Sequence, residues 1–447
     1  MEIPETRYAK TTDGVHIGFQ VVDGGPTDLV FVPYDYSNIE ASWDLPQYVS
    51  FVGGLATHAR VLLFDRRGTG TSDRGSGDVT PPIEARMDDI RAVMDAAGSE
   101  RACLFGIESG AALCFLFAAT YPERTAGVVV FGAIVRGAWA HDYPWGWNED
   151  EWSSWMEKVE SGWGSPAFVR DVVEWISPSL AGDVTFARTM GRMLRLSASP
   201  GEAVARDEML RDTDVRDILL SIQVPSLVIH RTRDRVEPVG QGRYIADRIS
   251  GAAFLELPGD DHYFPFDDLV PHIAGFLGTI RDEEAEFDRV LATVLFTDIV
   301  GSTERASSMG DRAWRNLVER HHATVRSLLA RYRGSEIDTA GDGFFATFDG
   351  PARAVRCARA IAEAMRPLGI EIRAGVHTGE VETIDGKVGG MAVNIGARVA
   401  GHAAPCEVVV SQTVKDLVAG SGLTFEDAGE HELKGVPDRW RLYRVVS

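Results

Sequence analysis

Apolar and polar positions alternate in a regular order through the first 280 residues. One stretch, IEARMDDIRAVMDAAG (83–98), repeats its apolar residues with the period of an amphipathic helix. Short continuous apolar runs, typical of buried strands, occur at DLVFVPY (28–34), RVLLFD (60–65), RACLFG (101–106) and VPSLVIHRTRD (224–234). Strands that alternate with helices predict a doubly wound α/β sheet, in which functional residues lie at the ends of the strands.

This order changes between about residues 138 and 215, where tryptophans gather. The segment holds seven of the ten tryptophans, namely Trp139, Trp145, Trp147, Trp152, Trp155, Trp163 and Trp175. Trp152, Trp155 and Val159 share one face of a predicted helix. We interpret the segment as a helical insertion. Its aromatic residues either line a site for a small apolar ligand or form the core of the insertion itself.

A charged segment with little periodicity, GTIRDEEAEFDR (278–289), follows the last strands of this region. We interpret residues 281–289 as a linker, because such a composition neither buries an apolar face nor repeats with the period of a strand. The linker divides the chain into two predicted domains, 1–280 and 290–447.

The second half predicts fewer and longer elements. RVLATVLFTDIVGST (289–303) indicates a buried strand that ends at Asp298 and a turn of small residues. EIDTAGDGFFATF (336–348) indicates two strands joined by a tight turn, with Asp342 at its tip. GGMAVNIGARVAG (389–401) indicates a helix, on which two polar residues four positions apart share one face.

The composition allows two hydrophobic cores, and the net charge is distributed unevenly along the chain. The chain has 447 residues, of which 45% are hydrophobic, and a net charge of −21. Residues 289–447 contain 20 basic and 20 acidic side chains, so the whole excess lies in residues 1–288. An acidic first half disfavours nucleic acid and anionic membranes as partners, because both would repel it. The neutral second half can accept a polyanionic small substrate if cations cover the charge.

Neither a secretion signal nor a membrane span is predicted. The start, MEIPETRYAKTTDGVHIGF, lacks a basic region followed by an apolar one. The longest apolar stretches fall short of the roughly 20 residues that a bilayer span needs. Four scattered cysteines (Cys103, Cys114, Cys357, Cys406) favour reduced thiols over disulfides or a zinc site. We therefore expect a cytoplasmic protein without a membrane partner.

The stretch GIESG (106–110) follows a predicted strand and opens an apolar helix. It resembles the nucleophile elbow, G-x-S-x-G, of the α/β-hydrolase family, with Glu108 in the position of the serine. The resemblance extends to an acid and a histidine in the expected order, Asp234 at a strand end and His262 in LPGDDHYFPF. It implies an α/β-hydrolase fold with a helical lid at about 138–215.

Two departures from the family pattern count against ester hydrolysis. Glu108 has no hydroxyl for His262 to activate, and a carboxylate beside the imidazole raises the pKa of that histidine. The loop after the first strand reads Pro33-Tyr34 where many relatives have His-Gly, so a tyrosine crowds the approach to the oxyanion. We expect a degenerate triad and a structural or ligand-sensing domain, with an unusual hydrolase as the alternative.

Two aspartates beside glycine-rich turns, Asp298 and Asp342, suggest a pair of carboxylates for hard cations. Asn394 and Arg398 offer an amide and a planar cation to one ligand. The motifs FTDIVGST, GDGFFATF, IRAGVHTGEV, NIGAR and HELKG occur in the order of the class III nucleotidyl cyclase catalytic domain. The resemblance covers residues 290–447 and implies an α+β, ferredoxin-like fold. The whole chain resembles bacterial fusions of a hydrolase-like domain to a cyclase.

The cyclase resemblance implies a role for each motif residue. Asp298, Asp342 and the carbonyl of Ile299 would hold two Mg²⁺ or Mn²⁺ ions at each active site, where a 3′-hydroxyl attacks the α-phosphorus of a nucleoside triphosphate. Backbone N–H groups of Gly301, Ser302 and Thr303 would bind phosphate. Asn394 would orient the ribose, Arg398 would neutralise the transition state, and Lys434 would hold the terminal phosphates. In this family the two groups come from opposite protomers, which implies a head-to-tail homodimer.

The predicted base-reading residues depart from the adenylyl cyclase pattern. Asp338 stands where these enzymes have a lysine, and Lys387 stands where they have an acid or threonine. The exchanged charges are complementary to adenine and, on paper, to guanine as well. We expect ATP as substrate, with GTP or loose purine specificity as the alternative.

A third hypothesis is a lid-bearing hydrolase whose cyclase-like half only dimerises. The ligand of the first domain and the direction of regulation do not follow from the sequence.

Overall fold

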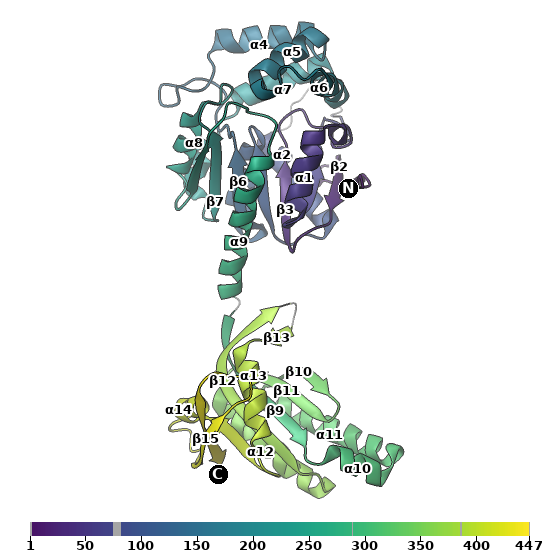
Figure 1. Cartoon of the computed structure of the whole chain (residues 1–447), viewed down its shortest axis with the longest axis vertical. Coiled ribbons are helices and arrows are strands. Elements are labelled where there is room, and N and C mark those ends of the chain that lie inside the picture. Colours follow the sequence, from purple (N-terminus) through teal and green to yellow (C-terminus); the bar gives the residue numbers. More distant parts are fainter. Residues whose placement is uncertain (1, 75–81, 288, 385–386, 447) are drawn as a thin grey trace. The chain divides into compact units, whose positions relative to one another are not determined.

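The computed structural model describes residues 2–74, 82–287, 289–384 and 387–446 (Figure 1). The chain divides into two compact units, a first unit of Met1–Asp282 and a second unit of Glu283–Ser447. The residues interpreted as a linker, 281–289, continue a helix as far as Phe287, and a strand begins at Arg289. Glutamate and alanine favour helix, which explains why this charged stretch does not form a loop. Among the described residues, no helix combines the length and the apolarity of a bilayer span.

The first unit is built on an eight-stranded sheet in the order β1-β2-β4-β3-β5-β6-β7-β8. The strands from β4 to β8 in this order run parallel, and β1 and β2 add an antiparallel edge. Their bounds are β1 Arg7–Lys10, β2 His16–Val22, β3 Thr27–Val32, β4 Ala59–Phe64, β5 Ala102–Ile107, β6 Thr125–Phe131, β7 Ser226–Arg231 and β8 Ala253–Leu257. The predicted doubly wound sheet is confirmed.

Helices cover both faces of this sheet, which explains why its central strands are apolar on both sides. One core joins the sheet to α1 and α9, and the other joins it to α2, α3 and α8. These helices span α1 Pro46–Ala56, α2 Ile83–Ala97, α3 Gly110–Thr120, α8 Val239–Ala246 and α9 Val270–Phe287. Short 3₁₀ helices lie at Ala41–Asp44, Pro122–Arg124, Pro178–Leu180, Arg216–Ser221 and Asp267–Leu269.

Four further helices lie between β6 and β7 and gather at one end of the first unit (Figure 1). They are α4 Glu149–Gly162, α5 Pro166–Ile176, α6 Val184–Ser197 and α7 Pro200–Asp212. Each begins at a residue whose side chain accepts a backbone hydrogen bond, respectively Asn148, Ser165, Asp183 and Ser199. Such caps stabilise a helix by about 1 kcal/mol each, so the insertion has well-defined helix starts.

The second unit is a mixed sheet in the order β10-β11-β9-β12-β14-β16-β15, with β13 paired to β12. Its bounds are β9 Arg289–Ile299, β10 Ser335–Ala340, β11 Gly343–Phe348, β12 Ile372–Ile384, β13 Lys387–Gly389, β14 Val408–Ser411, β15 Phe425–Glu432 and β16 Arg439–Val445. The helices are α10 Ser302–Met309, α11 Asp311–Tyr332, α12 Pro351–Met365, α13 Met391–Gly401 and α14 Gln412–Leu417, with a 3₁₀ turn at Arg366–Leu368. The central β-α-β-β-α-β order is the one predicted.

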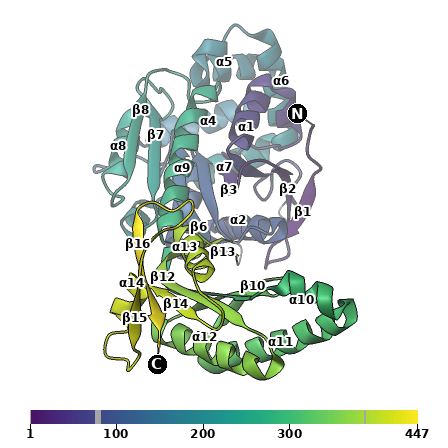
Figure 2. The same ribbon diagram turned by 60° about the horizontal axis from the view of Figure 1, so that its bottom comes forward.

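Helices lie on both faces of the second sheet (Figure 2). Leu295 and Ile299 of β9 belong to the core that contains α11 and α12, whereas Val294 contacts α13 on the opposite face. Gly375 of β12 lets α13 approach closely, because a Cβ there would stand 2.1 Å from the backbone nitrogen of Ala400. The sheet therefore fixes the position of α13, which carries Asn394 and Arg398.

Candidate functional sites in the two units

The two predicted metal-binding carboxylates come together at one end of the second sheet. Asp298 is the penultimate residue of β9, and Asp342 lies in the two-residue turn between β10 and β11. The N–H of Ile299 donates a hydrogen bond to Oδ2 of Asp342 at 3.2 Å. Burial and the neighbouring charge of Asp298 raise the pKa of Asp342, and its hydrogen bond from Ser302 partly opposes this. The two carboxylates therefore repel each other.

A cation already faces one of these carboxylates. Arg373 lies opposite Asp298 in the β9–β12 register, and its Nε donates to Oδ2 of Asp298 at 3.1 Å. The pKa of Asp342 is nevertheless raised, first by burial and then by the charge of Asp298. Among the described residues, no cluster of three or more His, Cys, Asp or Glu side chains could hold a metal. Two neighbouring carboxylates nevertheless offer the oxygen ligands that a hard divalent cation prefers.

The turn predicted to bind phosphate, residues 301–303, comes shortly after the end of β9. Gly301 has φ +67° and precedes the first residue of α10, Ser302. Glycine takes this left-handed conformation without steric cost, which turns the chain from β9 into the helix. The N–H groups of Gly301, Ser302 and Thr303 thus lie at a helix start beside Asp342, where anions are stabilised.

The predicted transition-state residues form a second, separate group. Asn394 and Arg398 are exposed on α13, and Nε of Arg398 donates to the carbonyl oxygen of Lys434 at 3.2 Å. Lys434 is an exposed residue in the turn between β15 and β16. Within the described part of the chain, no hydrogen bond or ion pair joins this group to the carboxylates Asp298 and Asp342. The single chain thus presents two partial sites.

The two predicted base-reading residues lie on different strands. Asp338 is exposed on β10, beside a bulge, and its Oδ1 accepts a hydrogen bond from the N–H of Thr339 at 2.8 Å. Lys387 begins β13, opposite Ile384, and its side chain lies outside the described part of the structure.

In the first unit, Glu108 occupies a sharp turn between β5 and α3. Its φ is +50°, a left-handed conformation that is rare for residues other than glycine. The hydroxyl of Tyr263 donates a hydrogen bond to Oε2 of Glu108. Burial raises the pKa of Glu108, and the charge of His262 and the bond from Tyr263 oppose this effect. The backbone is that of a nucleophile elbow, but the group it presents is a hydrogen-bonded acid.

The acid and histidine predicted for the triad are in contact. Nδ1 of His262 lies 2.7 Å from Oδ2 of Asp234, and the side chains of both residues are fully buried. Burial alone would lower the pKa of His262, but Asp234, Glu108 and Glu237 together raise it to about 9. Among the residues that the structure describes, none forms a hydrogen bond with Nε2 of His262. Ser109, the neighbouring hydroxyl, accepts instead from Nη1 of Arg66 at 3.1 Å.

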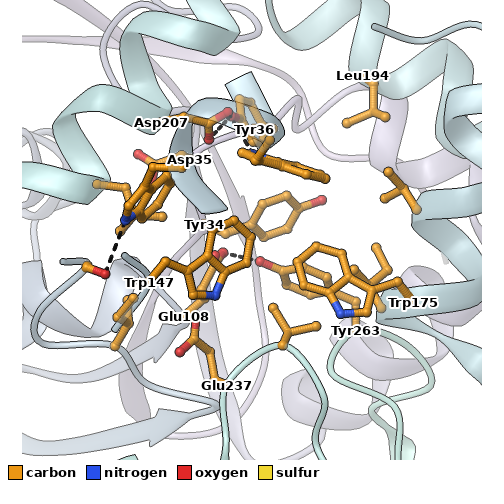
Figure 3. A pocket seen from close by; sticks show the side chains of 18 of the residues that line it. Tyr34, Asp35, Tyr36, Glu108, Trp147, Trp175, Leu194, Asp207, Glu237 and Tyr263 are labelled. Atoms are coloured by element: carbon orange, nitrogen blue, oxygen red, sulfur yellow. Dashed lines mark hydrogen bonds between the residues drawn. The ribbon is translucent and has the colours of Figure 1, made fainter. Parts of the chain in front are cut away.

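A cavity of about 100 Å³ lies above Glu108, beneath the inserted helices (Figure 3). Tyr34 lines it and packs against Tyr263 with 4.6 Å between ring centroids. Sequence reasoning missed three further acids in its wall, Asp35, Asp207 and Glu237. Asp35 and Glu237 follow strand ends, a signal that could have found them, whereas Asp207 has the appearance of an ordinary charged helix residue.

The chain is similar to two families of proteins. Residues 284–447 match the model of the adenylate and guanylate cyclase catalytic domain, and residues 37–167 match that of the alpha/beta hydrolase fold. The chain therefore carries a class III cyclase catalytic domain after an α/β-hydrolase fold, and the predicted fold class is confirmed.

Two relatives illustrate matches that each cover part of the chain. "Putative adenylate cyclase 3" of Rhizobium meliloti is 29% identical over 157 residues, which cover 33% of this chain and 27% of that protein. The chain thus spans about a quarter of the length of that relative. The 3-oxoadipate enol-lactonase 1 of Acinetobacter baylyi is 24% identical over 201 residues, 44% of this chain and 70% of the lactonase.

A solved structure agrees with the fold of the first unit. An esterase from Exiguobacterium antarcticum superposes with a TM-score of 0.51 and 18% identity, and the match covers 62% of this chain and all of the esterase. At this identity the likeness concerns the fold alone.

Proposed function

We propose that the chain is a nucleotidyl cyclase that converts ATP to 3′,5′-cyclic AMP and pyrophosphate. The observation that supports this most directly is the meeting of Asp298 and Asp342 beside the phosphate turn. Like charges are held close in a folded protein where a bound cation compensates them. The match of the second unit to the cyclase catalytic domain supports the same reaction class.

The residues of the second unit divide the chemistry between them. Asp298, Asp342 and the carbonyl of Ile299 would hold two Mg²⁺ or Mn²⁺ ions, which when bound acidify the 3′-hydroxyl and screen the phosphates. The N–H groups of residues 301–303 bind and orient the triphosphate at the start of α10. Asn394 orients the ribose, and Arg398 stabilises the charge that develops on the α-phosphoryl oxygens. Lys434 holds the terminal phosphates.

We further propose that the active form is a head-to-tail homodimer. Arg398 and Lys434 are hydrogen-bonded to each other, yet no bond connects them to the carboxylates within the described chain. A second copy in antiparallel orientation would bring the carboxylates of one protomer to the Arg398 group of the other. Both sites would then be completed by symmetry.

The base is proposed to be adenine, read by Asp338 and Lys387, with guanine as the alternative. Asp338 is exposed and uses one carboxylate oxygen for the N–H of Thr339. The other oxygen is available to accept from an exocyclic amine. Both purines offer such a donor, so we keep a guanylyl or promiscuous purine cyclase as the second substrate hypothesis.

For the first unit we propose a ligand-sensing role without ester hydrolysis, in a protein of the cytoplasm. Glu108 accepts a hydrogen bond from Tyr263, and Ser109 is engaged by Arg66, so neither supplies a hydroxyl to His262. The intact pair of His262 and Asp234 is the one feature that favours the alternative, a lid-bearing hydrolase whose second unit only dimerises.

One assay on the purified full chain separates these hypotheses. The protein is incubated with ATP and, in parallel, with GTP in the presence of Mn²⁺, and the cyclic nucleotide formed is quantified by mass spectrometry. We expect cyclic AMP from the wild type and none from Asp298→Ala, because the metals lose a ligand. Asp349→Ala, an exposed acid of the same unit, is the matched control. Unchanged turnover by Asp298→Ala, or ester hydrolysis that depends on His262, would overturn the proposal.

A further inference from the structure

The cavity in the first unit has an unusual wall. Ten of the 23 residues that line it are aromatic, among them six tryptophans, and four are acids. No lysine, arginine or histidine is among the described residues that line it. Aromatic faces are electron-rich, and carboxylates are negative, so the whole wall favours positive charge.

The aromatic rings form two packed groups around the same space. Trp147, Trp155 and Trp175 contact one another, with ring centroids 5.4 to 6.1 Å apart. Tyr34 and Tyr263 pack together near Glu108 (Figure 3). Rings held this firmly present fixed faces, which reduces the entropy lost when a ligand binds.

Two of the four acids in the wall, Glu237 and Asp207, have buried carboxylates whose negative charge is not fully offset by neighbouring groups. Glu237 is 7% exposed, and among the described residues the one hydrogen bond to its carboxylate comes from Gln241. Burial, with the charges of Glu108 and Asp234, raises the pKa of Glu237 well above its usual range, although the charge of His262 opposes this rise. Burial also raises the pKa of Asp207 to about 7, although Tyr36 and Trp155 donate hydrogen bonds to it. These carboxylates would gain from a cation in the cavity.

The basic residues nearest the cavity are already engaged one layer behind its wall. Arg66 is ion-paired with Asp35 at 2.9 Å, and Nη2 of Arg206 donates to the backbone carbonyl of Arg67 at 2.8 Å. His262 is held by Asp234. Of the four acids in the wall, Asp35 therefore has a counter-charge of its own, whereas Glu237 shares the charge of His262 with Asp234 and Glu108.

An outer groove of about 600 Å³ shares Trp147, Trp155 and Trp175 with the cavity. Its rim carries the acids Asp150, Glu151 and Asp171 and the bases Lys158 and Arg235, and Lys158 is paired with Asp171 at 3.4 Å. The rim thus retains an excess of negative charge. Such a groove raises the local concentration of cations at the entrance.

We propose that this cavity binds an organic cation with an apolar body, such as a quaternary ammonium compound. Its positive head would lie between the indoles and the carboxylates Glu108 and Glu237, and its methyl groups would contact the aromatic faces. A neutral apolar ligand of the same shape would instead leave the carboxylates dehydrated and unpaired, which is unfavourable. This proposal names a ligand class for the proposed sensing role. Its biological purpose rests on that role, whereas binding of the cation does not.

Binding to the full chain is measured by tryptophan fluorescence and calorimetry with two matched pairs of probes. Choline is compared with 3,3-dimethylbutan-1-ol, and benzyltrimethylammonium with neopentylbenzene. Each pair differs by a nitrogen cation against a carbon of the same shape. We expect at least one cation to bind, about tenfold more tightly than its neutral isostere. Equal or tighter binding of the isosteres, or no binding of either cation at millimolar concentration, would overturn the proposal.

Charge variants test which groups recognise the cation. Glu108→Gln and Glu237→Gln keep the side-chain size and should each weaken the cation about tenfold while leaving the isostere unchanged. Glu174→Gln, an exposed acid of α5 outside the cavity, is the control and should bind normally. If both cavity variants bind the cation as the wild type does, the assignment is wrong. Because binding is read directly, its failure is distinct from a failure of cyclase activity or of its regulation.

Discussion

The N–H of Ile299 donates a hydrogen bond to Oδ2 of Asp342, with 3.2 Å between nitrogen and oxygen. Together with the pairing of β11 to β9, this bond holds the turn of the β10–β11 hairpin at the end of β9, where Asp342 lies beside Asp298. The arrangement is electrostatically unfavourable for the chain alone, because burial and Asp298 both raise the pKa of Asp342. The divalent cations that we propose for this site would offset the repulsion between the two carboxylates.

Asp342→Asn should separate metal binding from folding. Removal of one of two repelling carboxylates is expected to leave the melting temperature unchanged or higher in metal-free buffer. Wild type at a Mn²⁺ concentration about one hundred times its Kd should gain about 2.7 kcal/mol, and the variant should gain far less. Calorimetric melting with and without Mn²⁺ measures this. Asp349→Asn serves as the control, and an equal Mn²⁺ response in Asp342→Asn would contradict the metal site.

Complementation between two inactive variants tests the shared active site. Asp298→Ala and Arg398→Ala each remove one half of every site in a homodimer. In a mixed dimer, both lesions fall in one site and the other site is intact. An equimolar mixture that exchanges subunits should therefore recover about a quarter of the wild-type activity. Recovery is measured as cyclic nucleotide formed per protomer, and an inactive mixture that nevertheless contains mixed dimers would refute the two-subunit site.

Exchanging the base-reading charges tests the substrate assignment. The double variant Asp338→Lys with Lys387→Asp places a cation and an acid where adenylyl cyclases have them. If the pair reads the base, its ratio of kcat/KM for ATP over GTP should rise, by about tenfold if one hydrogen bond is gained. Parallel steady-state assays with both nucleotides give the ratio. No change would remove both residues from base recognition.

The sequence predicted elements well where local pattern and global fold agree. The turn at Gly341–Asp342, the elbow at Glu108 and the helix carrying Asn394 are all present, because glycine spacing and apolar periodicity act over a few residues. It did not specify that the predicted linker is helical as far as Phe287, because its charged composition suits an exposed helix as well as a loop.

Contacts between distant residues could not be predicted from spacing. The pairing of Tyr263 with Glu108 joins residues 155 positions apart, and Arg373 meets Asp298 only through the β9–β12 register. Asp207 of α7 lines the cavity, where Tyr36 and Trp155 donate hydrogen bonds to it, and no local pattern marks that approach. Such contacts depend on how elements pack, which periodicity does not specify.

Glu108→Ser asks whether the rest of the hydrolase site is competent. We expect no turnover of p-nitrophenyl acetate or butyrate. Tyr34 crowds the approach of the substrate carbonyl, and Pro33 has no N–H to stabilise an oxyanion. The assay follows nitrophenolate release, and circular dichroism verifies that the variant is folded. Hydrolysis that disappears in the double variant Glu108→Ser with His262→Gln would show a latent active site instead.

The stability of the first unit should depend on the protonation of His262. Its pKa in the folded state is about 9, above the ordinary value of 6.5, so the folded state binds the proton more tightly. This contribution is fully present below pH 6.5 and is lost as the pH rises through 9; the shift corresponds to about 3 kcal/mol. Urea unfolding followed by tryptophan fluorescence reports on this unit, which holds eight of the ten tryptophans. As the pH rises through 9, the free energy of unfolding of the wild type should fall relative to that of His262→Gln. If the two proteins lose stability equally with pH, the ionised pair of His262 and Asp234 is contradicted.

The left-handed backbone at Glu108 bears on how this position came to hold its residue. A side chain other than glycine costs about 1 kcal/mol in that conformation, and glycine or asparagine would relieve most of it. The turn by itself thus gives no reason to keep a glutamate once the serine is gone. A glutamate that persists despite this cost is more readily explained by a function of its carboxylate than by the shape of the turn alone. Libraries randomised at codon 108 can rank how well other residues replace that function.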